Sequence, residues 1–433
     1  MLFPMFLRNA FLLLLFLLRT QASAAAPTLR IPQGAQAGPG FNAETATRAY
    51  LATLPPDKKA RSDAYFEGGY WLILWDFLYG AAISIFLLNM RFSLRMRNSA
   101  ERITKRKGLQ TWLYWVQYSL ALFILSLPLA IYEGFFREHH YGLSNQTLGG
   151  GFGDQLKGLG LAIVLGGLAV VALFAIVRRL PRTWHIWGAG AAIVFLMIGM
   201  LIGPVFIAPL FNKYTVLTNA RVRDPILRLA RQNGIPATNV YEVDASRQSK
   251  RVSANVSGFL GTERITLNDN LLNRCSPEAI FAVMGHEMGH YVLNHVYKML
   301  VFFVLIVLLL FAALRWALHK SLARWGVHWG INGVGDPAVL PVVALLLSAF
   351  AFLLTPVINT LIRTQEYEAD IFGLNTSRQP DGFAEAALLL GEYRKLNPGP
   401  LEELIFFDHP SGRTRIYSAM RWKAENQSLP SSR

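Results

Sequence analysis

The segment 286–290 has the sequence His-Glu-Met-Gly-His and is an HExxH motif. Residues four apart share one face of a helix, so His286 and His290 would point the same way and could hold one Zn²⁺ between them. Glu287 directly follows His286, where its carboxylate could take a proton from a water that the metal activates. Because so short a motif also occurs by chance, it needs support from the rest of the chain.

A catalytic zinc site uses three protein ligands, and the third should come from another segment. Glu366 and Asp370 are four residues apart and directly follow the last apolar span. On a helix they would share a face, so one carboxylate could bind the metal while the other accepts the free N–H of a ligand histidine. Alone, the two residues fit an exposed acidic helix face better. Together with HExxH they favour a metal site.

A third segment with polar side chains begins at His409, which precedes a proline and is followed by Arg413 and Arg415. A histidine and an arginine placed in this way could donate hydrogen bonds to an oxyanion. A surface loop before a capped helix explains the same residues equally well. The pattern alone does not decide which of the two arginines would contact the oxyanion.

Two neighbours of the predicted ligands receive structural interpretations. His295 lies five residues beyond His290 and would be rotated away from the metal on a continuous helix, so we interpret it as a structural histidine with satisfied hydrogen bonds. Glu368 would lie on a different face from Glu366, where we expect it to be solvated or ion-paired.

The composition is that of a membrane protein with a soluble portion. Of 433 residues, 53% are hydrophobic and only 16% are charged, against about 25% charged in soluble domains. The net charge of +15 would suggest a nucleic-acid partner in a soluble chain. No recognition motif accompanies the charge, so we expect no nucleic-acid partner. Cys275 is the only cysteine, which excludes an intrachain disulfide and a cysteine-rich zinc site.

The chain is predicted to be a mainly α-helical membrane protein, a multi-span helical bundle with a small α/β domain that carries the HExxH motif. Residues 1–26 have the pattern of a signal peptide or an N-terminal anchor, and 27–65 are expected to form an exposed, partly disordered lead-in. Four spans at about 69–90, 111–132, 157–177 and 186–208 make a membrane domain over 66–209. Two more, about 297–318 and 338–361, follow in 297–361.

The stretch 210–296 is predicted to hold the zinc site, and 362–433 to complete it with the third ligand. A helix is expected over 222–232, and short strands over 239–243, 252–259 and 264–268, the last two joined by a turn at 261–262. Ser276, Pro277 and Glu278 predict the start of the helix that carries HExxH: a cap, a proline in the first turn and an early acid. The motif therefore has the helical context that metal binding requires.

Charges in the loops predict the orientation in the membrane. Basic residues cluster between the first and second spans, the third and fourth, and the fifth and sixth, which makes these loops cytoplasmic by the positive-inside rule. The cluster members are Arg91, Arg95, Arg97, Arg102, Lys105, Arg106, Lys107, Arg178, Arg179, Arg182, Lys320 and Arg324. The predicted zinc domain would then face the other side, the periplasm if the chain lies in a bacterial inner membrane.

The order and spacing of HExxH, Glu366-x-x-x-Asp370, His409-Pro410 and Arg415 resemble the integral-membrane CAAX prenyl endopeptidase family of zinc metalloproteases. The loop 138–148 (Glu-His-His-Tyr-Gly-Leu-Ser-Asn-Gln-Thr-Leu) and the segment 207–214 (Ile-Ala-Pro-Leu-Phe-Asn-Lys-Tyr) resemble family sequences too. The resemblance covers about 65–425 and implies membrane helices around a water-filled chamber.

In that family pattern one Zn²⁺ would be held by His286, His290 and Glu366, with Glu287 as general base. Asp370 would orient a ligand histidine, and the resemblance implies that His409 and Arg415 contact the substrate carbonyl or its tetrahedral intermediate; these residues are identified by matching positions in the family motif.

The chain departs from the family pattern at Ser253, where the family usually has Asn before Ala254. This strand is the expected edge for an extended substrate, so the departure bears on substrate choice. The family also commonly places its protease domain in the cytosol, whereas the loop charges here predict the opposite face.

The predicted function is zinc-dependent endopeptidase activity in the membrane, on a peptide or protein substrate with or without an attached lipid. CAAX-type processing and quality control of membrane proteins both fit this prediction. A transporter and a non-catalytic, zinc-stabilised membrane chaperone are the alternatives. Neither the oligomeric state nor the natural substrate follows from the sequence.

Overall fold

The computed structural model describes residues 27–257 and 263–426. Within these ranges, six helical segments are long and apolar enough to cross a membrane. Each overlaps one predicted span, and together they confirm a multi-span helical protein. They are Pro56–Asn89, Lys107–His140, Leu148–Arg179, Trp184–Leu210, His295–Trp329 and Pro337–Ser377. The predicted signal peptide or anchor and the predicted turn at 261–262 lie outside the described residues.

The individual elements follow one another along the chain with few long loops. The helices of the membrane part are α3 (Pro56–Asn89), α4 (Phe92–Ile103), α5 (Lys107–Ile131), α6 (Glu138–His140), α7 (Leu148–Leu161), α8 (Gly167–Arg179), α9 (Trp184–Ile202), α13 (His295–Trp329) and α14 (Leu340–Ser377). Those outside it are α2 (Ala43–Leu51), α10 (Ala220–Gln232), α11 (Asp269–Arg274), α12 (Pro277–Val292), α15 (Pro380–Leu390), α16 (Pro400–Phe406) and α17 (Gly412–Glu425).

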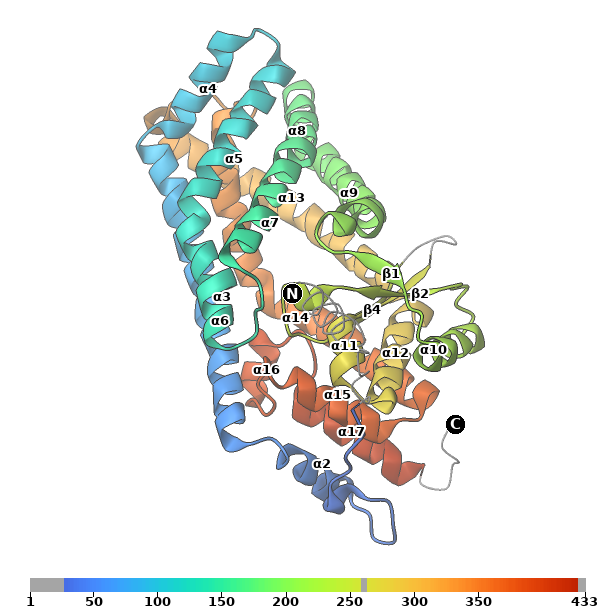
Figure 1. The fold of residues 1–433 in the computed structure, drawn as a ribbon. Helices are drawn as coiled ribbons and strands as arrows, with labels where there is room; N and C mark the ends of the chain where they lie inside the picture. Colours follow the sequence, from blue (N-terminus) through green and yellow to red (C-terminus); the bar gives the residue numbers. More distant parts are fainter. Residues whose placement is uncertain (1–26, 258–262, 427–433) are drawn as a thin grey trace, which may run out of the picture.

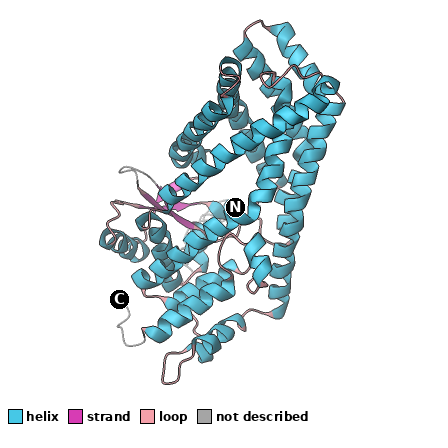
Figure 2. Cartoon of the chain, turned by 180° about the vertical axis from the view of Figure 1, so that it is seen from behind, coloured by secondary structure: helices cyan, strands magenta, loops and turns pink. Residues whose placement is uncertain are grey.

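The long helices form one elongated part of the molecule, and the short helices gather with the sheet at one end of it (Figure 1). Viewed from behind, the strands are a small element among helices (Figure 2). A buried apolar cluster joins α3, α5, α13 and α14 in the membrane part. A second cluster lies between α10, α12 and the sheet. The mainly helical architecture with a small α/β unit agrees with the predicted fold class.

The sheet has four short strands in the order β1-β2-β4-β3. They are β1 (Tyr214–Val216), β2 (Val240–Val243), β3 (Ala254–Ser257) and β4 (Arg264–Asn268). β2 and β4 are parallel, whereas β1 and β3 run antiparallel to their neighbours. The predictions for β2, β3 and β4 are confirmed; β3 begins two residues later than expected, and its predicted end at 259 lies outside the described residues. Within the described sheet β3 is an edge strand.

The predicted lead-in over 27–65 is largely exposed, as expected, but it contains α2 and the start of α3 instead of a disordered segment. The structure has α2 there, and it packs against α17. Tyr50 of α2 is 1% exposed, and its hydroxyl donates a hydrogen bond of 2.8 Å to Asp381. Lys423 of α17 binds the same carboxylate at 2.7 Å and donates to the carbonyl of Ala35. A few small residues and the ring of Tyr50 are therefore enough to anchor α2, although most of this segment stays exposed.

Candidate metal centre

Helix α12 positions the HExxH motif, and its start follows the predicted chemistry. Ser276 accepts a hydrogen bond from the backbone N–H of Ala279, and Pro277 occupies the first turn. The helix buries Met284 and Met288 completely against the sheet side. His286, on another face, is 6% exposed. Capping and burial together therefore fix both the register of α12 and the face that carries the histidines.

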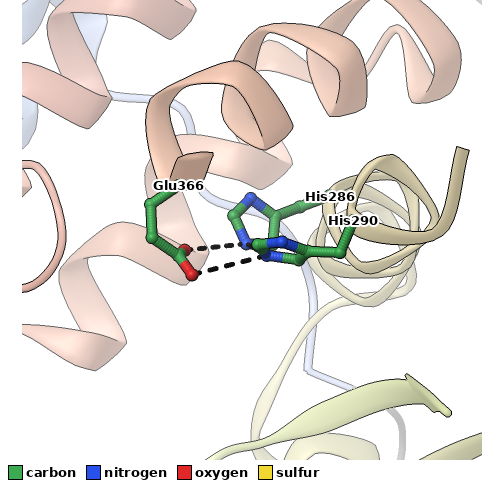
Figure 3. A group of neighbouring side chains, drawn as sticks. All are labelled: His286, His290 and Glu366. Carbon is green, nitrogen blue, oxygen red and sulfur yellow. Dashed lines mark hydrogen bonds and ion pairs between the residues drawn. The ribbon is translucent and has the colours of Figure 1, made fainter. Parts of the chain in front are cut away.

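The third predicted ligand reaches the motif from α14, at the end of a membrane-spanning helix. Glu366 is 8% exposed. Its Oε2 lies 3.2 Å from Nε2 of His286, and its Oε1 lies 3.4 Å from Nε2 of His290. Figure 3 shows the carboxylate pointing at the two rings from the opposite side. The structure thus brings together the three residues that sequence analysis selected from positions eighty residues apart.

The close approach of α12 and α14 depends on glycine. A Cβ atom added to Gly373 of α14 would lie 2.7 Å from the backbone nitrogen of His286, and one added to Gly285 would lie 3.0 Å from the carbonyl of Gly373. Contacts below about 3.0 Å do not occur for real Cβ atoms. The two helices can therefore bring His286 and Glu366 together only because both surfaces lack side chains here.

The three side chains fit a metal ion by geometry and by donor type. His286, His290 and Glu366 each offer one ligand atom, and these atoms lie within 4.8 Å of one another. The two Nε2 atoms are 3.1 Å apart. Zn–N bonds of about 2.0–2.1 Å at a tetrahedral angle need donor atoms about 3.3–3.4 Å apart, close to the separations observed. Two imidazoles and one carboxylate are also the ligand set of known catalytic zinc sites.

Asp370 lies behind His286 on the side away from the ligand atoms. Its Oδ1 is 2.7 Å from Nδ1 of His286, and the residue is 1% exposed. Arg415 in turn donates from Nε and Nη2 to Asp370, at 2.9 and 2.5 Å. Of the two carboxylates left open by the sequence, Glu366 therefore faces the ligand atoms and Asp370 the rear of a histidine. Arg413 instead forms an ion pair with Glu44.

His409 also reaches this cluster, from the loop between α16 and α17. Its Nε2 lies 3.2 Å from Oε2 of Glu366, and its Nδ1 lies 2.8 Å from Asp408. The side chain keeps 23% of its surface exposed. His409 therefore joins His286, His290, Glu366, Asp370 and Arg415 in one cluster of residues that were selected from the sequence.

The interpretation of His295 was incomplete, because it also touches a predicted ligand. Its Nδ1 lies 2.9 Å from Nδ1 of His290. The reason is backbone conformation: α12 ends at Val292, and Asn294 adopts a left-handed conformation with φ 58°. Helical periodicity does not continue through such a residue, and His295 is turned back toward His290. Asn is tolerated in this conformation more readily than most residues, which was the available sequence signal.

Glu287 lines a cavity of about 670 Å³ next to the ligand residues. Loss of solvent around its carboxyl raises the pKa to about 7 when only the protein's own groups act on it. A pKa near the working pH suits a residue that must both accept and release a proton. The same cavity is lined by His409, Arg415 and the start of the edge strand at Ala254. The cavity therefore places a carboxyl group, hydrogen-bond donors and the start of an edge strand around one space.

Two family models match almost the whole described chain. One is peptidase family M48, over residues 216–423. The other is the N-terminal part of CAAX prenyl proteases, described as five membrane helices, over residues 43–213. The boundary between them falls at β1, where the membrane helices give way to the sheet.

Curated relatives include proteins from bacteria, plants and yeast. An uncharacterized metalloprotease, YhfN of Bacillus subtilis, is 29% identical over 335 residues, which are 77% of this chain and 78% of the relative. CAAX prenyl protease 1 homolog of Oryza sativa is 31% identical over 66% of this chain and 68% of its own length. CAAX prenyl protease 1 of Saccharomyces cerevisiae is 29% identical over 68% of each chain.

A solved structure has the same fold. The crystal structure of S. mikatae Ste24p superposes with a TM-score of 0.71 at 24% identity, covering 87% of this chain and 95% of that one. The family models, the relatives and the clustered histidines and carboxylates agree with the resemblance found in the sequence. The chain belongs to the CAAX prenyl protease family of integral-membrane metalloendopeptidases.

Proposed function

We propose that this protein hydrolyses peptide bonds with one Zn²⁺ held by His286, His290 and Glu366. The observation that carries the proposal is the meeting of three possible ligand atoms within 4.8 Å of one another, with Glu287 lining the same cavity as His286. A bound zinc ion would lower the pKa of water and polarise a carbonyl group. Zinc is preferred to other divalent ions because two imidazoles and a carboxylate match its catalytic sites.

Glu287 is proposed as the general base. Its carboxylate takes a proton from the attacking water and passes it to the leaving amine as the C–N bond breaks. Asp370 accepts the Nδ1 hydrogen of His286 and keeps that ring's Nε2 free for the metal. His409 and Arg415 line the cavity, and we assign them hydrogen bonds or positive charge toward the oxygen on which negative charge develops.

The substrate is proposed to bind as an extended chain along β3. This strand has one sheet neighbour, β4, and residues 252–254 line the cavity, so a peptide could add to its open edge by backbone hydrogen bonds. Ser253, where the chain departs from the family pattern, lies in this segment and would alter contacts close to the substrate backbone. Processing of CAAX-type C-termini, lipidated or not, and cleavage of other membrane proteins both suit such a site.

The catalytic site is proposed to face away from the cytoplasm. Arg97 and Lys107 come from the basic loop after the first span and Arg178 from the loop after the third, yet all three line one pocket together with Asp336. In Figure 1 this basic end, marked by α4, lies opposite the sheet and α12. The positive-inside rule then supports a periplasmic site in a bacterial inner membrane. Reporter fusions at the loop after α4 and after α17 would test this orientation.

The decisive experiment is a comparison of zinc content and peptide cleavage in detergent-purified protein. The wild type should bind nearly one zinc per chain and cleave peptides. Glu287→Gln should keep zinc and lose cleavage, whereas Glu366→Ala should lose or greatly weaken zinc binding. Cleavage by Glu287→Gln at a near-wild-type rate would refute the assigned base and leave a zinc-stabilised, non-catalytic role. Solute flux in vesicles without any peptide cleavage would favour a transporter instead.

A further inference from the structure

His295 lies between a proposed zinc ligand and an acidic residue of α14. Its Nδ1 is 2.9 Å from Nδ1 of His290, and its Nε2 is 3.1 Å from Oε2 of Glu368. The side chain is 3% exposed. Glu368 is 42% exposed and also binds Lys298 at 2.6 Å. A ligand histidine is thus connected to the protein surface through one buried imidazole.

The hydrogen atoms along this chain can be assigned in only one way if His290 binds a metal. Metal binding through Nε2 of His290 puts the ring's hydrogen on Nδ1, which must then donate. His295 accepts it with Nδ1, so its own hydrogen is on Nε2 and is donated to the Glu368 carboxylate. Every polar atom of both rings is then satisfied, and no buried donor lacks a partner.

The other proposed ligand, His286, also needs an acceptor for its Nδ1 hydrogen, but a different kind of residue supplies it. Nδ1 of His286 faces the carboxylate of Asp370 directly, at 2.7 Å. For His290 no carboxylate touches Nδ1 among the contacts of the described residues, and His295 stands in that position. His295 does not itself complete the ligand set, because both of its nitrogen atoms are already engaged away from Glu366.

We propose that His295 and Glu368 form a positioning relay, in which His295 fixes the tautomer and ring orientation of His290, and Glu368 fixes those of His295. This inference rests on the proposed function of His290 as a zinc ligand. Partners of this kind usually contribute 10–100-fold to metal affinity. Removing the acceptor would leave the Nδ1 hydrogen of His290 buried without a partner, which opposes the tautomer that binds metal.

Zinc affinity, measured by competition with a chelator of known affinity, tests the relay without relying on activity. His295→Leu keeps the size of the side chain but removes the acceptor, and should weaken zinc binding about 10–100-fold. His295→Asn is smaller but places a carbonyl oxygen near the former Nδ1, and should recover most of the affinity. The matched control is His319→Leu, the same exchange at an exposed position of the same helix, which should bind zinc like the wild type.

The order of the two His295 variants separates positioning from packing. A packing role predicts that leucine is tolerated better than asparagine, so tighter zinc binding by His295→Leu than by His295→Asn would overturn the relay. Wild-type affinity in both variants would also overturn it. The proposed function would survive either result, provided that the wild type binds zinc and cleaves peptides. A wild type that binds no zinc would overturn both proposals.

A second pair guards against the case in which His295→Leu does not fold. Glu368 lies at the surface, so its variants should be tolerated. Glu368→Gln keeps an oxygen that accepts the Nε2 hydrogen of His295, whereas Glu368→Ala does not. The relay predicts measurably weaker zinc binding in Glu368→Ala than in Glu368→Gln, and equal affinities in the two would count against it.

Discussion

The ion pair between Asp370 and Arg415 offers a test that separates stability from metal binding. The two residues are 1% and 8% exposed, and two nitrogen atoms of the guanidinium contact the carboxylate. We consider three variants: Asp370→Leu, Arg415→Met, and the two together. Each single change leaves one buried charge without its partner, while the double change leaves neither.

The expected magnitudes follow from this burial. Breaking a buried ion pair from one side costs about 3–5 kcal/mol, whereas replacing both partners by apolar residues is often neutral. Asp370→Leu and Arg415→Met should therefore each destabilise the protein strongly, and the double variant should recover most of that loss. Zinc affinity should behave differently, because every variant without Asp370 lacks the acceptor at Nδ1 of His286. That affinity should stay about 10–100-fold weaker even in the double variant.

Thermal unfolding in detergent should be measured with a chelator present, because a ligand that binds only the folded state raises apparent stability. Zinc affinity should be determined separately on the same preparations. A double variant as unstable as the single variants would refute the compensation argument. A double variant with restored zinc affinity would refute the role of Asp370 in orienting His286. A double variant with recovered stability and weakened zinc affinity would support both the compensation argument and the role of Asp370 in orienting His286.

Three further predictions concern helix packing, the N-terminal segment and the single cysteine. Gly373→Ala should destabilise the protein by about 1–3 kcal/mol and weaken zinc binding, because its Cβ would meet the backbone of His286 at 2.7 Å; Gly199→Ala, with open space around it, should do neither in the same melting and zinc assays. Asp381→Ala should speed limited proteolysis of residues 27–55, since it removes the partner of the α2 and α17 side chains; an unchanged cleavage rate would contradict the packing of α2. Burial raises the pKa of the Cys275 thiol to about 12, so almost no thiolate forms at pH 8 and alkylation should require unfolding, as mass spectrometry of iodoacetamide-treated protein would show.

Elements with a strong local signal were predictable from the sequence. Runs of about twenty apolar residues predict the membrane spans, and a serine cap followed by proline predicts the start of α12. The strand over 264–268 was predicted with its observed limits. Spacing of four residues was also enough to place Glu366 and Asp370 on one face of α14. In each case the information lies within a few turns of one element, where periodicity holds.

Features that depend on a break in periodicity or on distant contacts were not predictable. His295 was expected to point away because a helix was assumed to continue past Asn294, and one residue in the left-handed conformation reverses that conclusion. The burial of Tyr50 depends on Asp381 and Lys423, which lie more than 300 residues further along the chain. The choice between Arg413 and Arg415 likewise depends on which side of α17 faces Asp370.

The position of Glu366 ties the metal centre to the membrane part of the molecule. α14 runs from the basic end of the bundle to α12 without interruption over residues 340–377, and it supplies Glu366, Asp370 and Glu368 near its end. The soluble α/β unit supplies the two histidines but no third ligand among the described residues. Because the two parts meet through glycines, a small displacement of α14 would separate Glu366 from both histidines. Metal affinity should therefore report on packing within the bundle, although Glu366 is the one proposed ligand that the described part of the bundle supplies.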